Sequence, residues 1–240
     1  MGNKIGVIGG MGPMASQLFY KMITEKTDVN KDQDHIEMVI ISDSTMPDRT
    51  TAIMKKDYNP VVKKLLEDCM FLEMAKCDAI TITCNTAHFF IDKVEPYLNI
   101  PIINMIEETA EYVAKQGNVS KVAVLATDGT IKSELYQNAL RKRNIEPYVV
   151  SKDKQKLVMY EIYERVKAGL PCDEAIWKEI EDEVFGVGCN MALLACTELS
   201  VIKSEINLDN RFIDPLEVLT DKTIGFSNHN IKKGKGDFFT

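Results

Sequence analysis

The sequence predicts an α/β protein built from two similar doubly wound parallel sheets. Short apolar runs of strand length alternate with helical patterns along the chain. The runs are apolar throughout, as in strands that are buried on both faces of a parallel sheet. Two pairs of segments also align with one another, which indicates that the two halves of the chain share one order of elements.

The expected strands are the apolar runs at residues 4–8, 35–42, 79–83, 100–104, 121–126, 147–150, 191–195 and 211–213. The expected helices are the periodic segments at residues 14–27, 60–76, 86–97, 106–117, 133–144, 155–168, 173–187 and 198–205. Strands that alternate with helices in this order predict parallel sheets with helices on both faces.

The internal repeat defines the expected domains. Residues 121–133 align with residues 4–16 at an offset of 117, and residues 188–196 align with residues 76–84 at an offset of 112. We expect a first domain of residues 1–103 plus 208–226 and a second domain of residues 104–207, related by a pseudo-twofold axis. Residues 227–240 are polar and contain glycine, so a mobile tail is expected there.

Composition excludes several function classes. The formal net charge is −7, which disfavours a nucleic acid or an anionic membrane as partner. No apolar stretch reaches the roughly 18 residues of a membrane span, and no export signal is visible at the N-terminus. We therefore expect a cytoplasmic protein with reduced thiols. The cysteines and histidines lack zinc-binding spacing, so no metal site is expected.

Cys84 and Cys196 are the candidate catalytic residues. Ligands of doubly wound sheets bind beyond the carboxyl ends of the strands, and both cysteines lie there, each just before an expected helix. To invert an amino-acid α-carbon, a proton must leave one face and another must arrive on the opposite face, which two thiols can achieve. A small buried side chain is the alternative for either cysteine alone. Their matching positions in the two halves favour catalysis.

Five segments, taken in order and spacing, resemble the aspartate/glutamate racemase superfamily, and specifically its aspartate racemase branch. They are Gly9-Gly10-Met11-Gly12-Pro13, Pro47-Asp48-Arg49, Cys84-Asn85-Thr86-Ala87-His88, residues 195–200 around Cys196-Thr197-Glu198, and Ile213-Asp214-Pro215-Leu216. The similarity covers about residues 4–223. It implies two Rossmann-like domains, an active site in the interdomain cleft, a homodimer, and a reaction without pyridoxal phosphate or metal.

The resemblance also implies a substrate site. Arg49 and Lys167 correspond to the cations that hold the side-chain carboxylate, and a guanidinium fork with an ammonium point charge suits one anion. A solvated surface side chain is the alternative for each, and Arg165 is close enough to compete with Lys167. The other expected site residues are Met11, Gly12, Asn85, Thr86, Thr127, Thr130, Thr197 and Glu198.

The α-carboxylate is expected at Asn85, Thr86 and Thr197, whose backbone amides open the helices after the cysteines. Thr127 and Thr130 add hydroxyl donors, although threonines in such turns often serve only as helix caps.

The remaining site residues come from two turns. Met11 and Gly12 should line the cleft near Cys84, where glycine lets the backbone approach a small ligand closely. The same glycine-rich turn lacks the GxGxxG spacing of a dinucleotide site. Glu198 either orients the substrate ammonium or simply occupies the first turn of its helix.

These observations predict a cofactor-independent racemase that interconverts L- and D-aspartate. Within the superfamily, the alternatives are a glutamate, broad-specificity or hydantoin racemase, and an arylmalonate-type decarboxylase, which keeps only one of the two thiols. From another class, the alternative is a two-lobed protein that binds a small molecule without catalysis. The paired cysteines count against it.

Overall fold

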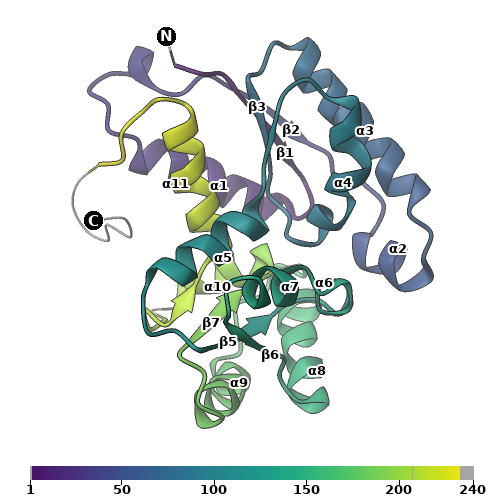
Figure 1. Ribbon diagram of the computed structural model, residues 1–240, viewed down its shortest axis with the longest axis vertical. Helices are drawn as coiled ribbons and strands as arrows, with labels where there is room; N and C mark the ends of the chain where they lie inside the picture. Colours follow the sequence, from purple (N-terminus) through teal and green to yellow (C-terminus); the bar gives the residue numbers. More distant parts are fainter. Residues whose placement is uncertain (1, 207, 233–240) are drawn as a thin grey trace.

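The computed structural model describes residues 2–206 and 208–232 and contains two four-stranded parallel sheets (Figure 1). The first sheet has the order β2-β1-β3-β4, with β1 (Ile5–Gly9), β2 (Met38–Ser42), β3 (Ala79–Ile82) and β4 (Ile102–Ile103). The second repeats this order as β6-β5-β7-β8, with β5 (Lys121–Leu125), β6 (Glu146–Tyr148), β7 (Met191–Leu194) and β8 (Phe212–Ile213). The predicted pair of similar parallel sheets is confirmed.

The helices of the first half are α1 (Pro13–Lys26), α2 (Arg49–Lys55), α3 (Asn59–Met74) and α4 (Ile91–Val94), with 3-10 turns η1 (Asp32–Asp34), η2 (Thr86–Phe90) and η3 (Glu95–Tyr97). After β4 come α5 (Met105–Lys115), α6 (Asp128–Ser133), α7 (Leu135–Arg141), α8 (Lys152–Tyr160), the π-helix η4 (Glu161–Val166), α9 (Glu174–Gly186), α10 (Thr197–Glu205) and α11 (Pro215–Phe226). Within the described part of the chain, no helix has the length and apolar character that crossing a membrane requires.

The strands read as apolar runs because both faces of each sheet are buried. In β5, Val122 and Val124 pack into one apolar cluster, whereas Ala123 and Leu125 pack into another on the opposite face. The first sheet is sandwiched in the same way between two clusters. Alternation of side chains along a strand therefore serves two cores, one on each face.

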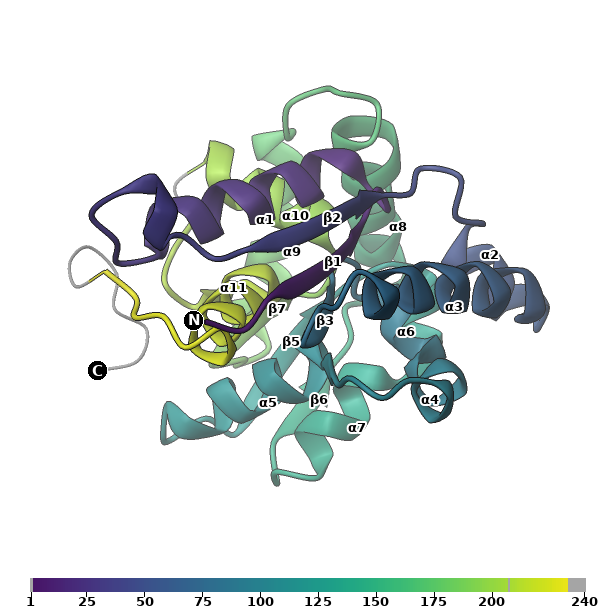
Figure 2. The ribbon, with the colours of Figure 1, turned by 90° about the horizontal axis from the view of Figure 1, so that it is seen from above.

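The two halves exchange the helices that follow their last strands. Helix α5 follows β4 but packs through Ile106 and Ala110 against the second sheet and α7. Helix α11 follows β8 but packs through Leu216 and Leu219 against α1 and the first sheet (Figures 1 and 2). Strand β8 itself pairs with β7, so the expectation that all of residues 208–226 complete the first domain is wrong for this strand.

Two expected helices are divided, and a third begins later than expected. The one at residues 133–144 corresponds to α7, which is separated from the unexpected α6 by Glu134, whose φ of 55° lies in the left-handed region that non-glycine residues rarely adopt. The one at residues 86–97 consists of η2, α4 and η3, and the one at residues 155–168 changes from α8 into the π-helix η4. Helix α2 was not expected; Asp48 caps it by accepting a hydrogen bond from the Thr51 amide.

Residues 227–232 are held against the end of α1, contrary to the expectation of a mobile tail from residue 227. Ser227 is fully buried, and Ile231 forms an antiparallel bridge with Thr27. The amide of Asp28 donates to the carbonyl of Asn230 at 2.8 Å. Backbone hydrogen bonds thus fix this polar segment. Residues 233–240, also part of the expected tail, lie outside the described residues.

Candidate active site

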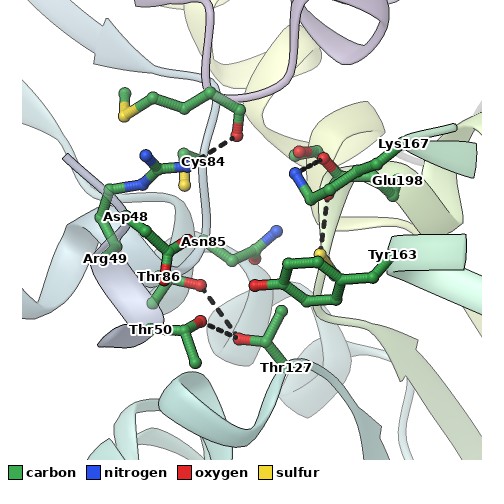
Figure 3. Close-up of a pocket in the computed structure, with 13 residues that line it drawn as sticks. Asp48, Arg49, Thr50, Cys84, Asn85, Thr86, Thr127, Tyr163, Lys167 and Glu198 are labelled. Atoms are coloured by element: carbon green, nitrogen blue, oxygen red, sulfur yellow. Dashed lines mark hydrogen bonds and ion pairs between the residues drawn. The ribbon is translucent and has the colours of Figure 1, made fainter. Parts of the chain in front are cut away.

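A narrow pocket of about 20 Å³ lies between the two halves, beyond the carboxyl ends of their strands (Figure 3). This volume is about that needed to hold a single water molecule. The pocket is lined by Met11, Asp48, Arg49, Thr50, Cys84, Asn85, Thr86, Thr127, Tyr163, Lys167, Cys196, Thr197 and Glu198. Of the expected site residues, only Gly12 and Thr130 are set back from the pocket surface.

The two candidate thiols enter the pocket from opposite halves. Cys84 follows β3 and Cys196 follows β7, and each is 6% exposed. The other matched pair, Cys77 and Cys189, comes before the same strands and so lies at their amino ends, away from the pocket. Placement at opposite ends of parallel strands separates the two pairs of cysteines.

The two thiols have different immediate neighbours. The Cys196 thiol donates a hydrogen bond to Glu198 Oε2 at 2.9 Å. Burial and the negative charge of Glu198 raise the pKa of Cys196 well above its usual value. Cys84 instead lies beside Arg49: burial, the largest single effect, lowers the pKa of this guanidinium, but Cys84, Asp48 and Glu198 together raise it above its usual value. One thiol thus adjoins a carboxylate and the other a cation.

Arg49 is held by neutral acceptors. Its Nη1 donates to the carbonyls of Met46 at 3.2 Å and Pro47 at 3.0 Å, and its Nη2 donates to the carbonyl of Met11 at 3.4 Å. Its buried Nε has no hydrogen-bond partner among the described residues. The guanidinium is therefore fixed in direction while its charge stays available for an anion in the pocket.

Lys167 and Glu198 form an ion pair across the pocket wall (Figure 3). Burial, the largest single effect, lowers the pKa of Lys167, but Glu198, Cys196 and Cys84 together raise it above its usual value. Glu198 thus binds Lys167 through Oε1 and Cys196 through Oε2. A Cβ at Gly12 would come within 2.8 Å of Glu198 Oε1, so glycine permits this close approach. Although Glu198 lies in the first turn of α10, its carboxylate points into the site.

Asn85 directs an unpaired amide into the cleft. The side chain is 2% exposed, and its Oδ1 accepts a hydrogen bond from the Tyr136 hydroxyl at 2.5 Å. Its Nδ2 has no partner among the described residues. Figure 3 shows this amide directed toward the space between Cys84 and Lys167.

Threonine hydroxyls connect the two halves beside the pocket. Thr86 Oγ1 lies 2.8 Å from Thr130 Oγ1 and 3.3 Å from Thr127 Oγ1, and Thr50 donates to Thr127 at 3.3 Å. Thr127 also caps α6 through the Thr130 amide, so it serves as a helix cap and as a pocket residue. Helices α2 and α6 touch here, and a Cβ at Gly129 would lie only 2.8 Å from the Thr50 Cα.

His88 fixes the turn that carries Cys84. The Met105 amide donates to His88 Nε2 at 3.1 Å, so Nδ1 carries the proton and donates to the Cys84 carbonyl at 2.9 Å. Burial lowers the pKa of His88 to about 4, which keeps the ring neutral. The cysteine turn is thereby tied to the start of α5, where the chain enters the second half.

Asp48, Thr50 and Tyr163 line the pocket although the sequence analysis did not select them. A signal existed for Tyr163, because it stands four residues before Lys167 in an expected helix, a spacing that places two side chains on one face. In the structure Lys167 Nζ lies over the Tyr163 ring, 5.6 Å from its centroid. Asp48 and Thr50 were missed together with α2.

Comparisons with known proteins agree with this architecture. Residues 8–223 match the model of the Asp/Glu/Hydantoin racemase family. The chain is 25% identical over 226 residues to the broad specificity amino-acid racemase RacX of Bacillus subtilis (strain 168), covering 92% of this chain and 96% of that protein. The Picrophilus torridus aspartate racemase is 32% identical, with a TM-score of 0.82 and coverage of 97% of each chain. An aspartate racemase homologue from Pyrococcus horikoshii OT3 is 25% identical, with a TM-score of 0.74 over 94% of this chain and 99% of that chain. The protein therefore belongs to the Asp/Glu/hydantoin racemase family, and racemases are isomerases.

Proposed function

We propose that this protein interconverts L- and D-aspartate, with Cys84 and Cys196 exchanging protons with the α-carbon. The observation that carries the proposal is that two thiols from opposite halves line one small pocket that also holds an arginine and a lysine. A dicarboxylic amino acid matches this set, because it brings two anionic groups and one acidic carbon to the same place. The likeness to the Picrophilus torridus aspartate racemase supports the choice of aspartate.

In the proposed complex, Arg49 and Lys167 bind the side-chain carboxylate. Arg49 contributes a charge that backbone carbonyls hold in place, and Lys167 is the other cation that lines the pocket. The α-carboxylate is bound by the Asn85 amide together with the backbone at Thr86 and Thr197, at the starts of η2 and α10.

In the proposed reaction, the Cys84 thiolate takes the α-proton from one face while the Cys196 thiol gives its proton to the opposite face. One Cα–H bond breaks as an S–H bond forms, and the reverse occurs on the other side. Arg49 lies beside Cys84, and Glu198 accepts a hydrogen bond from the Cys196 thiol and raises the pKa of that thiol. The opposite direction uses the thiols in exchanged roles.

The direct test monitors a solution of L-aspartate by circular dichroism after the protein is added. No cofactor is added, a chelator is present, and the optical activity should be lost. Turnover that requires pyridoxal phosphate or a divalent metal contradicts the proposal. Binding of aspartate with full retention of optical activity instead supports a two-lobed binding protein. The likeness to RacX favours broad-specificity racemisation as the second candidate, for which neutral L-amino acids would racemise at rates comparable with that of aspartate.

The two-thiol step is tested with Cys84→Ser and Cys196→Ser. Racemisation should collapse in both, since each lacks a base or an acid on one face. In deuterated water each variant should still exchange the α-hydrogen of one enantiomer, and the two variants should prefer opposite enantiomers. Cys77→Ser, at the amino end of β3, is the control and should match the wild type. Near-wild-type racemisation by either serine variant contradicts the mechanism. The homodimer and the cytoplasmic location stay predictions.

A further inference from the structure

We infer that Tyr136 is a positioning residue for the α-carboxylate of the substrate, acting from the second half through Asn85 of the first. This inference rests on the proposed function, because it concerns how that same pocket distinguishes an α-amino acid from an amine that lacks the α-carboxylate.

Tyr136 is anchored where it cannot easily move. It lies on α7, is fully buried, and packs in the apolar cluster that contains Val124, Ala195 and Ile213 of the second half. Burial raises the pKa of Tyr136 well above its ordinary value, so the hydroxyl keeps its proton. That proton is donated to Asn85 Oδ1 at 2.5 Å. A rigid core therefore dictates where the oxygen of the Asn85 amide lies.

Because Tyr136 holds the Oδ1 atom of Asn85, the Nδ2 atom on the other side of the same amide faces the cleft. A buried amide nitrogen without a partner is costly in a folded protein, so its presence indicates a site for an acceptor that arrives with the ligand. If the amide were reversed, Oδ1 would face the ligand and repel its carboxylates. Asn85 directly follows Cys84, so its donors lie next to the reacting carbon, where the α-carboxylate must be.

The contact also links the binding site to the packing of the two halves. Tyr136 and Asn85 are 51 residues apart in sequence and belong to different halves of the protein. The donor toward the α-carboxylate is therefore set only when the halves are docked as in this structure, whereas the Arg49 contacts to Met46 and Pro47 are local to the first half.

The test is Tyr136→Phe, which removes one oxygen and keeps the ring. The KM for L-aspartate should rise by about tenfold, as expected for losing one well-oriented hydrogen bond to a charged group, while kcat changes by less than about threefold. β-Alanine carries the ammonium and the distal carboxylate but no α-carboxylate, so its inhibition constant should be the same for the variant and the wild type. Tyr148→Phe is the matched control, because the Tyr148 hydroxyl donates to Glu183 at 3.0 Å away from the pocket.

A second variant guards against poor folding of Tyr136→Phe. Asn85→Ala should give the same split between aspartate and β-alanine, and adding Tyr136→Phe to it should change the KM no further, because the tyrosine acts through the amide. Equal weakening of both ligands, or an unchanged KM for aspartate in either single variant, overturns the inference while leaving the racemase proposal intact. A wild-type protein that does not racemise aspartate overturns both.

Discussion

Gly129→Ala should lower the racemase activity strongly while it lowers the stability only modestly, because Gly129 lies where α2 and α6 meet beside the pocket. An added Cβ would lie 2.8 Å from the Thr50 Cα and 3.0 Å from Thr50 Oγ1. Ordinary contact begins at 3.4 Å, so α2 must retreat by at least about 0.6 Å. Thr50 cannot relieve the overlap by rotating its side chain, since the nearest atom belongs to the backbone. Helix α2 also carries Arg49, which therefore shifts with it.

The expected magnitudes follow from this displacement. A misplacement of about 1 Å in an active site can cost about 100-fold in rate, so we expect kcat/KM for aspartate to fall by roughly tenfold. Overpacking costs about 1–3 kcal/mol, and the helix propensity gained on replacing glycine by alanine offsets up to about 1 kcal/mol of that. The Tm should consequently fall by no more than about 12 °C.

The assay pairs initial rates of aspartate racemisation with thermal denaturation of the same samples. Gly186→Ala in α9 is the matched control, because nothing lies within 4 Å of its added Cβ, and it should keep wild-type rates with equal or higher stability. If Gly129→Ala retains kcat/KM within about twofold of the wild type, the contact between α2 and α6 does not position the site.

Three further changes test other parts of the structure. Arg49→Ala should lower kcat/KM for aspartate by about 10- to 100-fold but affect alanine far less, and an equal loss for both contradicts its role at the side-chain carboxylate. Glu198→Gln removes the negative charge that raises the pKa of Cys196, so the basic limb of the pH–rate profile should move to lower pH; an unmoved limb contradicts this. Burial and the neighbouring Asp43 raise the pKa of Asp68 to about 6. The charged Asp68 therefore lowers the free energy of unfolding above that pH, and this loss of stability decreases as the carboxylate binds a proton at lower pH. Asp68→Asn should therefore stabilise the fold by about 1–3 kcal/mol at pH 8 and by less at pH 5, as measured by urea denaturation. An equal gain at both pH values would show that the charge of Asp68 is not the cause.

The sequence was sufficient for the two sheets and for the thiols at their carboxyl ends. Residues 122–126, for example, are apolar at consecutive positions, as expected for a strand buried on both faces. Once the repeat is aligned, Cys84 and Cys196 occupy equivalent places. Each therefore lies at the carboxyl end of a strand of its own sheet, and the docking of the two halves brings both into one pocket.

What the sequence could not provide depends on contacts between distant segments. Residues 49–55 are too short and too polar to show a helical period, so α2 and its pocket residue Thr50 were missed. Tyr136 contacts Asn85 from a helix that begins after a break at Glu134, and no local pattern signals the break or the contact. A two-residue strand such as β8 carries too little information to reveal which sheet it joins.

The exchange of α5 and α11 between the halves bears on how such a chain could arise. A single ancestral unit with this order of elements would close its core only by trading its last helix with a second copy, as domain-swapped dimers do. Fusion of two such copies would place both exchanged helices in one chain, with the cleft already present between the two halves. Neither lobe is then a self-sufficient module: a fragment of residues 1–103 would lack Leu216 and Leu219, and with them part of the apolar cover over Ile5 and Val7.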